Sequence, residues 1–367
     1  MKKLNCWPRE DQELLLKAAL SKFPEAIIAW TNYLATHDLD HIEHACIHLL
    51  PLVYMNIQQN HVCKSVYRYW WASNHLFLNR FKQLLQTLIE QNIEPCLLKG
   101  GALMLCCYSS PGARVIGDID ILIDKSQVKK TIERLMSLGW QPSFEMENLE
   151  DYMKIKHGCH FTNQHNQCVD LHWLLSLRHV TNTSLAQVSY KTVRHFTEKL
   201  GREVVMLCPE DQLLHIFIHG IAESEQPLIR WVPDAAFILR HHTLFDWDYF
   251  FQQTKNAKIS FIVKPALEYL HEKNFIILSK RTLKSLGKLK DPWSEIFSAS
   301  FSRTKIVHTI RFVRLTWKEY RQKTPACCWV LALLRLPKYL SQRWRCENKV
   351  GFFRKLQKKF FKHLLGK

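Results

Sequence analysis

The stretch CLLKGGALMLCCYSSPGARVIGDIDILID, residues 96–124, decides the fold of this 367-residue chain. It opens with the apolar segment Cys96–Leu98, which predicts a short strand. Lys99-Gly100-Gly101 then predicts a tight turn into an apolar helix at 102–108. After a turn-rich connection, the alternating pattern of Asp118–Ile123 predicts a second strand.

Two carboxylates occupy alternate positions of this second strand. Alternate side chains of a strand share a face, so Asp118 and Asp120 are expected to point to the same side. Hard divalent cations bind carboxylate oxygens, and glycines at a helix start let backbone N–H groups approach phosphate. The combination predicts a Mg²⁺–phosphate site. Taken singly, the D-x-D pattern also suits a half-exposed strand, and the glycine pair also suits an ordinary tight turn.

The order LKGGAL, then R-x3-D-x-D with a hydrophobic residue, resembles the nucleotidyltransferase superfamily that includes polymerase β. It is most similar to a poorly characterised bacterial branch with the core L-K-G-x-A-L … R-x-x-x-D-I-D-I-L-V. The resemblance implies an α+β fold, with a mixed nucleotidyltransferase-type sheet between N-terminal and C-terminal helical segments. It implies a metal-binding, catalytic triad of Asp118, Asp120 and, in the later segment CVDLH, Asp170. One departure is the gap from the glycines to Asp118, which is longer than in compact members.

The same resemblance implies further site residues. Two Mg²⁺ ions and a nucleoside triphosphate are expected, with a nucleotide-binding set of Lys99, Gly100, Gly101, Arg114 and His172. The branch also carries P-E-x-x-L-L-H and L-R-W-x-x-D segments, with Ile229 here in place of the Leu. These segments imply candidate substrate contacts at His215, His219, Arg230 and Asp234. Each of these four side chains fits a structural role equally well.

A transition-metal site is the rival interpretation of the histidines. His157 and His160 have odd spacing, so on one strand they would face opposite sides. His215 and His219 have the i, i+4 spacing of a zinc pair, but the sequence H-I-F-I-H lacks the Glu of the metalloprotease motif. Both observations weaken a zinc-hydrolase interpretation.

Composition excludes several classes of protein. With 47% hydrophobic and 12% aromatic residues, the chain is expected to fold rather than to remain disordered. No apolar h-region follows the basic start and no stretch reaches the length of a membrane span, so neither a signal peptide nor a transmembrane segment is expected. The 12 cysteines include two adjacent pairs and no C-x-x-C, which favours reduced thiols in a cytoplasmic protein.

The pattern along the chain predicts four segments. Residues 1–93 show helical spacing, at 11–20, 41–57 and 66–93. Residues 94–206 form the expected catalytic core, including a hairpin of 157–162 and 167–172 that would bring Asp170 beside the D-x-D strand. Residues 207–302 predict a helical substrate or nucleotide domain, and 303–367 a basic, aromatic tail.

The tail carries most of the charge. Residues 303–367 contain 18 Lys and Arg against two Glu, a net of +16 out of +18 for the chain. Aromatic residues interleave with the basic ones. Three interpretations remain open: amphipathic helices on an anionic membrane, contact with nucleic acid or another polyanion, and packing on the protein's own domain.

These observations predict a Mg²⁺-dependent nucleotidyltransferase. It would move a nucleoside monophosphate from an NTP, with ATP as first choice, to an acceptor and release pyrophosphate; the acceptor class stays open among small molecules, peptides or proteins, and RNA. One alternative is a phosphotransferase that uses the same carboxylates, which the missing P-loop and kinase motifs disfavour. Another is a non-catalytic protein of this fold that binds RNA or membrane, which the three intact Asp residues disfavour. The expected location is the cytoplasm. The basic tail would also allow peripheral attachment to a membrane.

Overall fold

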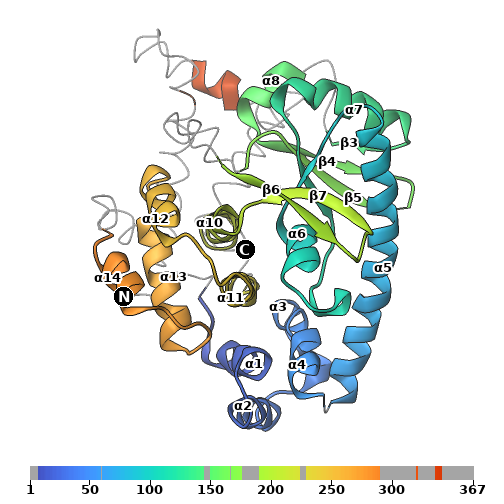
Figure 1. Cartoon of the computed structure of the whole chain (residues 1–367). Helices are drawn as coiled ribbons and strands as arrows, with labels where there is room; N and C mark the ends of the chain where they lie inside the picture. The colour runs from blue at the N-terminus through green and yellow to red at the C-terminus, as the bar shows by residue number, and fades with distance from the viewer. Residues whose placement is uncertain are drawn as a thin grey trace.

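A seven-stranded mixed sheet forms the centre of the molecule (Figure 1). The computed structural model describes residues 7–58, 60–143, 149–165, 167–175, 190–223, 229–289, 320 and 335–340. The strand order is β3-β4-β5-β2-β1-β7-β6. The strands are β1 (Cys96–Leu97), β2 (Ile119–Leu122), β3 (Gln141–Pro142), β4 (Gly158–Thr162), β5 (Cys168–His172), β6 (Thr192–Thr197) and β7 (Arg202–Leu207).

The strand pairing places the two sequence segments of the expected site next to each other. β1 pairs antiparallel with β2 and parallel with β7, and β2 pairs parallel with β5. β4 and β5 form the predicted hairpin, with Thr162 opposite Cys168. The prediction that this hairpin lies beside the D-x-D strand is confirmed.

The helix after β1 begins earlier than the sequence pattern predicts. It was expected from residue 102, but α6 spans Lys99–Cys106. Leu98 is extended, and Lys99 itself makes the sharp turn with φ of +47°, a left-handed value that is uncommon for a residue with a side chain. The glycines therefore lie in the first helical turn, where backbone N–H groups have no partner within the helix.

Helices precede the sheet, as the spacing predicts. They are α1 (Glu10–Leu20), α2 (Glu25–Leu34), α3 (His44–Ile47), α4 (Leu50–Ile57) and α5 (His61–Ile89). The pattern at 41–57 is two helices rather than one, with Pro51 in the first turn of the second, a position that proline favours. The long α5 starts five residues before its predicted start because the Asn60 side chain accepts hydrogen bonds from the N–H groups of Val62 and Cys63.

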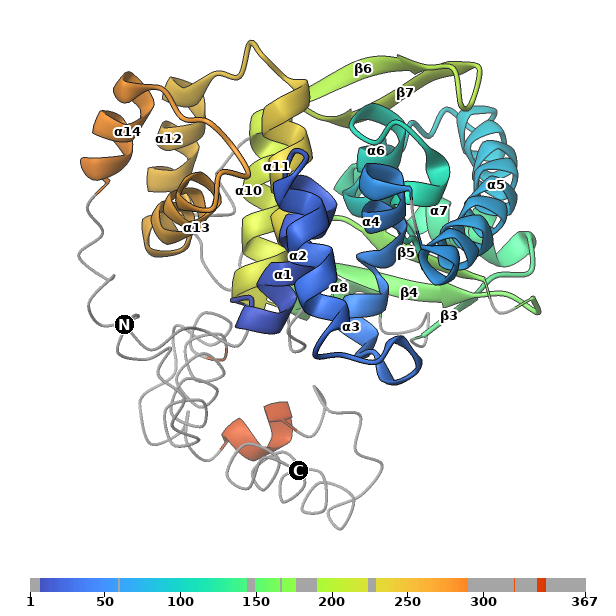
Figure 2. The same ribbon diagram turned by 90° about the horizontal axis from the view of Figure 1, so that it is seen from below.

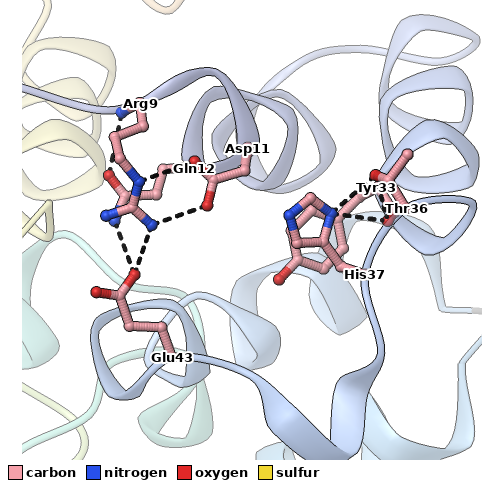
Figure 3. A network of polar contacts seen from close by, with 7 residues as sticks. All are labelled: Arg9, Asp11, Gln12, Tyr33, Thr36, His37 and Glu43. Carbon is pink, nitrogen blue, oxygen red and sulfur yellow. Dashed lines mark hydrogen bonds and ion pairs between the residues drawn. The ribbon is translucent and has the colours of Figure 1, made fainter.

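A polar network joins the start of α1 to the segment before α3 (Figure 3). The Arg9 guanidinium lies 2.8 Å from Asp11 and 2.6 Å from Glu43, and Gln12 completes a capping box with the Arg9 backbone. About half of the Arg9 side chain is exposed, so we expect these ion pairs to orient the helices more than to stabilise them.

The helices after the sheet form two layers. They are α10 (Pro209–Phe217), the π-helix η5 (Ile218–Glu223), α11 (Trp231–His241), α12 (Trp247–Asn256), α13 (Ser260–Glu272) and α14 (Lys280–Gly287). Figure 2 shows α10 and α11 between the sheet and the α12–α14 group. Two further helices, α7 (Val128–Ser137) and α8 (Leu149–Ile155), belong to the sheet region. The helical run that begins at Pro209 changes from an α-helix to a π-helix at Ile218.

One continuous buried cluster runs from Leu15 to Leu289 through all of these layers. Mixed sheet and flanking helices confirm the predicted fold class, whereas the division into four segments stays a prediction. Most of the predicted tail, 303–367, lies outside the described residues, so its three interpretations stay open. Within the described part, no helix combines the length and apolar character needed to cross a membrane.

Candidate active site

Carboxylates meet on neighbouring parallel strands. In the register of β2 and β5, Asp120 lies directly opposite Asp170, and Asp118 comes just before β2 on the same face by parity. One carboxylate oxygen each of Asp120 and Asp170 and a ring nitrogen of His172 lie within 4.8 Å of one another, and Asp118 is not part of this group. Residues far apart in sequence thus supply a compact set of donors.

Asp120 is the most enclosed of the three acids, with 3% of its surface exposed. Its Oδ1 accepts a hydrogen bond from Lys99 Nζ at 2.5 Å and lies 3.0 Å from His172 Nε2. Burial alone would raise the pKa of Asp120, but the Lys99 ammonium and the His172 ring outweigh it and hold the pKa well below its usual value. The same pairing raises the pKa of Lys99 against the effect of burial, so both groups stay charged.

Asp118 responds in the opposite way. Burial, followed by the negative charges of Asp120 and Asp170, raises the pKa of Asp118 to about 6, and Lys99 and Arg230 only partly offset them. The acidic set is therefore short of positive charge. Carboxylate oxygens are the donors that Mg²⁺ prefers, and a cation beside Asp118 would relieve this repulsion, so these residues fit the implied metal.

Asp170 has a partner that the sequence analysis did not identify. His160 lies opposite it across the β4–β5 hairpin, and the His160 Nδ1 to Asp170 Oδ1 distance is 2.6 Å. His157 precedes β4, and its ring centroid lies 5.3 Å from that of His172. The expectation that His157 and His160 would diverge by strand parity is wrong, because only His160 is in the strand and both side chains reach β5.

The two glycines of the turn have different surroundings. Gly100 lines the pocket described next, and a Cβ there would come within 3.4 Å of the Arg114 guanidinium. Gly101 is buried, and a Cβ there would come within 3.1 Å of a Leu97 methyl group. Gly101 thus allows α6 to pack closely on β1, while Gly100 faces the space in front of the carboxylates.

A pocket lies between the sheet and the α10–α11 layer. It brings together nine of the twelve sequence-predicted residues, while Gly101, Asp170 and His172 lie outside its lining. The nine are Lys99, Gly100, Arg114, Asp118, Asp120, His215, His219, Arg230 and Asp234. The glycine turn and the D-x-D strand therefore face one cavity in spite of the long gap between them.

The two arginines of the pocket differ in their partners. Arg114 makes a bidentate ion pair with Asp234, with both N–O distances at 2.8 Å, and the Tyr108 hydroxyl donates to the same carboxylate at 2.6 Å. Arg230 forms no ion pair among the described residues, and its one hydrogen bond there, to the Val115 carbonyl, is long at 3.5 Å. Burial and the neighbouring Arg114 charge lower the pKa of Arg230 to about 10.

The π-helix shapes the far wall of the pocket. His215 is buried on α10, and this burial, together with the Lys99 charge, holds the pKa of His215 well below its usual value. His219 and Gly220 follow within the π-helix, where a Cβ on Gly220 would come within 2.8 Å of Trp231 Cβ. Short π-helical segments are frequent at functional sites. Among the described residues, neither His215 nor His219 belongs to a group of three donors close enough to hold a metal.

Comparison with known proteins gives the family. The model of a family described as uncharacterised nucleotidyltransferase matches residues 47–273, more than half of the chain. The structure is similar to the antibiotic-resistance factor ANT(2'')-Ia, at 12% identity and a TM-score of 0.35 over 54% of this chain and 97% of that one. It is also similar to an antigenic nucleotidyltransferase-like protein from Paracoccidioides brasiliensis, at 16% identity and a TM-score of 0.36 over 60% of this chain and 96% of that one. No curated protein matches the sequence. On the family match, the chain belongs to the uncharacterised nucleotidyltransferases.

Proposed function

We propose that the chain transfers a nucleoside monophosphate from an NTP, with ATP as the first candidate, to an acceptor and releases pyrophosphate. Family membership gives the activity class, nucleotidyl transfer. The observation that supports the finer proposal is the register of Asp120 opposite Asp170, next to a pocket lined by Asp118, Asp120, Gly100 and Arg230. Acids to hold a cation and cationic groups to hold phosphate meet in one place.

In this proposal Asp118, Asp120 and Asp170 hold Mg²⁺. When bound, Mg²⁺ polarises the phosphoryl oxygens and neutralises charge on the departing pyrophosphate. Lys99 and His172 fix the orientation of the Asp120 carboxylate through its Oδ1. Asp170 is more open, with 27% of its side chain exposed, and we assign it the role of accepting the proton of the attacking hydroxyl, with His160 orienting it at 2.6 Å.

The triphosphate is assigned to the other side of the pocket. The start of α6 around Gly100 lines the pocket, and a helix start favours negative charge. Arg230 contacts phosphate directly because it has no carboxylate partner among the described residues. Lys99 and Arg114 are already paired and contribute positive potential, and Asp234 positions Arg114. The neutral His215 ring is assigned to hydrogen bonding with the nucleotide or the acceptor.

The test supplies the purified protein with Mg²⁺, an extract of host cells, and ATP labelled at either the α- or the γ-phosphate. Extract supplies the candidate acceptors, from small molecules to peptides, proteins and RNA. Transfer of the α label to a new species supports the proposal and identifies the acceptor. The control is Asp118→Asn/Asp120→Asn, in which this label should disappear.

The other outcomes are equally informative. Transfer of the γ label alone would replace nucleotidyl transfer with phosphoryl transfer at the same carboxylates. No transfer from ATP, GTP, CTP or UTP would overturn the catalytic proposal. A cytoplasmic location is part of this proposal, and the seven buried cysteines among the described residues, which are reduced, support it.

A further inference from the structure

Two thiols and an imidazole meet where α6 and α11 end. Cys106 is the last residue of α6 and Cys107 follows it, while His242 follows the end of α11. Both helices begin at the pocket, with Lys99 and Gly100 at the start of one and Arg230 just before the other. The cluster is therefore at the opposite ends of the two helices, and the catalytic proposal does not use it.

The spacing of the three side chains suits metal coordination. The two sulfur atoms are 3.1 Å apart, and Cys107 Sγ lies 3.8 Å from His242 Nε2. All three donor atoms lie within 4.8 Å of one another. Tetrahedral zinc with a Zn–S distance of about 2.3 Å and a Zn–N distance of about 2.0 Å separates its ligand atoms by roughly 3.5–3.8 Å. Small movements of the three side chains would bring these donors into that arrangement.

The two thiols are buried beside a positively charged side chain. Each Cys residue is only 7% exposed, whereas His242 is half-buried and leaves the cluster open on one side. The Lys199 ammonium donates hydrogen bonds to the carbonyls of Leu105 and Tyr108 and so places positive charge beside the pair. A positive charge beside the pair stabilises the thiolate forms that metal binding requires.

We propose that Cys106, Cys107 and His242 bind a borderline or soft transition-metal ion of the Zn²⁺ class. Two thiolates and a neutral imidazole suit such an ion, and there is no carboxylate among the three donors to attract Mg²⁺. Binding converts both thiols to thiolates and releases their two protons to solvent, without any change of oxidation state. Water completes the fourth coordination position on the half-buried side.

The ion acts as a clip between the two helices. Tyr108, the residue after Cys107, donates to Asp234 on α11 at 2.6 Å, and Asp234 holds Arg114 on the pocket wall. A metal that joins Cys107 to His242 would add a second link between α6 and α11, next to the Tyr108–Asp234 hydrogen bond. Its effect is on stability, and the reacting groups do not touch it.

Cobalt tests this site because thiolate–Co²⁺ charge-transfer bands report sulfur ligands and the ligand-field bands report tetrahedral geometry. The full chain, reduced with a phosphine, is titrated with Co²⁺ and then with Zn²⁺. We expect both sets of bands in the wild type, their loss when Zn²⁺ displaces Co²⁺, and a higher melting temperature with Zn²⁺. Cys106→Ser/Cys107→Ser should lose the bands and the thermal shift.

The chain offers a matched control in its second adjacent pair, because Cys327→Ser/Cys328→Ser removes the same number of thiols. That variant should keep the bands. If Cys106→Ser/Cys107→Ser fails to fold, His242→Ala still decides the question, because its half-buried ring is expected to be dispensable for folding and its loss should weaken Co²⁺ binding at least about tenfold. Absence of thiolate bands in the reduced wild type, their survival in Cys106→Ser/Cys107→Ser, or an unchanged affinity in His242→Ala would each overturn the proposal.

Discussion

The two ends of the α6–α11 pair carry different kinds of metal-binding atoms. The end at the pocket presents carboxylate oxygens, with Asp118, Asp120 and Asp170 around the paired Lys99. The other end presents two thiols and an imidazole. Hard cations prefer the first set of donors and zinc-like ions the second. Two short helices can therefore separate two metal preferences, provided that the packing between them stays fixed.

The strongest test of the oxygen end is Asp120→Asn. Asparagine keeps the shape but removes the charge that holds Lys99 and His172, so we expect turnover to fall at least about 1,000-fold, or about 4 kcal/mol in the barrier. The Mg²⁺ affinity, measured by calorimetry, should fall in parallel. Asp124→Asn is the control, because Asp124 follows the same strand but is exposed and caps the next turn. Equal activity of the two variants would remove Asp120 from the mechanism.

The contact that joins the two ends is tested by Asp234→Asn. The substitution leaves Arg114 buried with an incomplete partner and weakens the acceptor of Tyr108, so we expect the free energy of unfolding to fall by about 3–5 kcal/mol. Denaturant unfolding with circular dichroism measures it. Asp248→Asn removes an ion pair with Arg281 whose side chains are 74% and 84% exposed, and should change the same quantity by less than about 1 kcal/mol. A small loss for both variants would mean that the Arg114–Asp234 pair does not hold the helices together.

Local pattern was enough for the oxygen end. Alternation in 118–123 fixed the face of Asp118 and Asp120, and the hairpin placed Asp170 on the adjacent strand. Counting residues back from the Asn163 turn would also have shown that His160 lies opposite Asp170. Strand parity has a period of two residues, so these contacts can be read from the sequence itself.

Contacts between distant segments were not accessible in this way. Arg114 and Asp234 are 120 residues apart, and Cys107 and His242 are 135 residues apart. No periodicity relates such positions, because their distance depends on how two helices pack. The left-handed conformation of Lys99 was not predicted either, because a residue with a side chain seldom adopts a positive φ. Sequence therefore named the cations of the candidate site but did not show which carboxylate each of them contacts.

Arg230→Gln tests whether Arg230 contributes to nucleotide binding or to stability. In Arg230→Gln we expect KM for the NTP to rise about 10- to 100-fold, equivalent to about 1.4–2.8 kcal/mol, because a charge-assisted contact with phosphate is lost. Unfolding should be nearly unchanged, since Arg230 makes only one long hydrogen bond among the described residues. Arg194→Gln, which removes an exposed ion pair with Glu94, is the control for loss of charge. A destabilised Arg230→Gln with normal KM would assign Arg230 to structure.

The smallest expected effect is the pH dependence of Mg²⁺ binding. It distinguishes the two ends because their metal-binding groups lose protons over different pH ranges. The pKa of Asp118 is raised to about 6, so without a cation this carboxyl favours the folded state at low pH and loses that contribution as the pH rises from about 4 through 6. Protons and Mg²⁺ then compete, and Mg²⁺ affinity should increase about tenfold per pH unit up to pH 6 and level off above it. Calorimetry from pH 5 to 8 measures this, and Asp118→Asn should flatten the curve.

At the thiol end, the Cys106 contact raises the pKa of Cys107, so Zn²⁺ affinity should continue to rise across the range where the Mg²⁺ curve is level. Parallel curves for the two metals would show that both ions bind the same groups, and would remove the separation of the two ends.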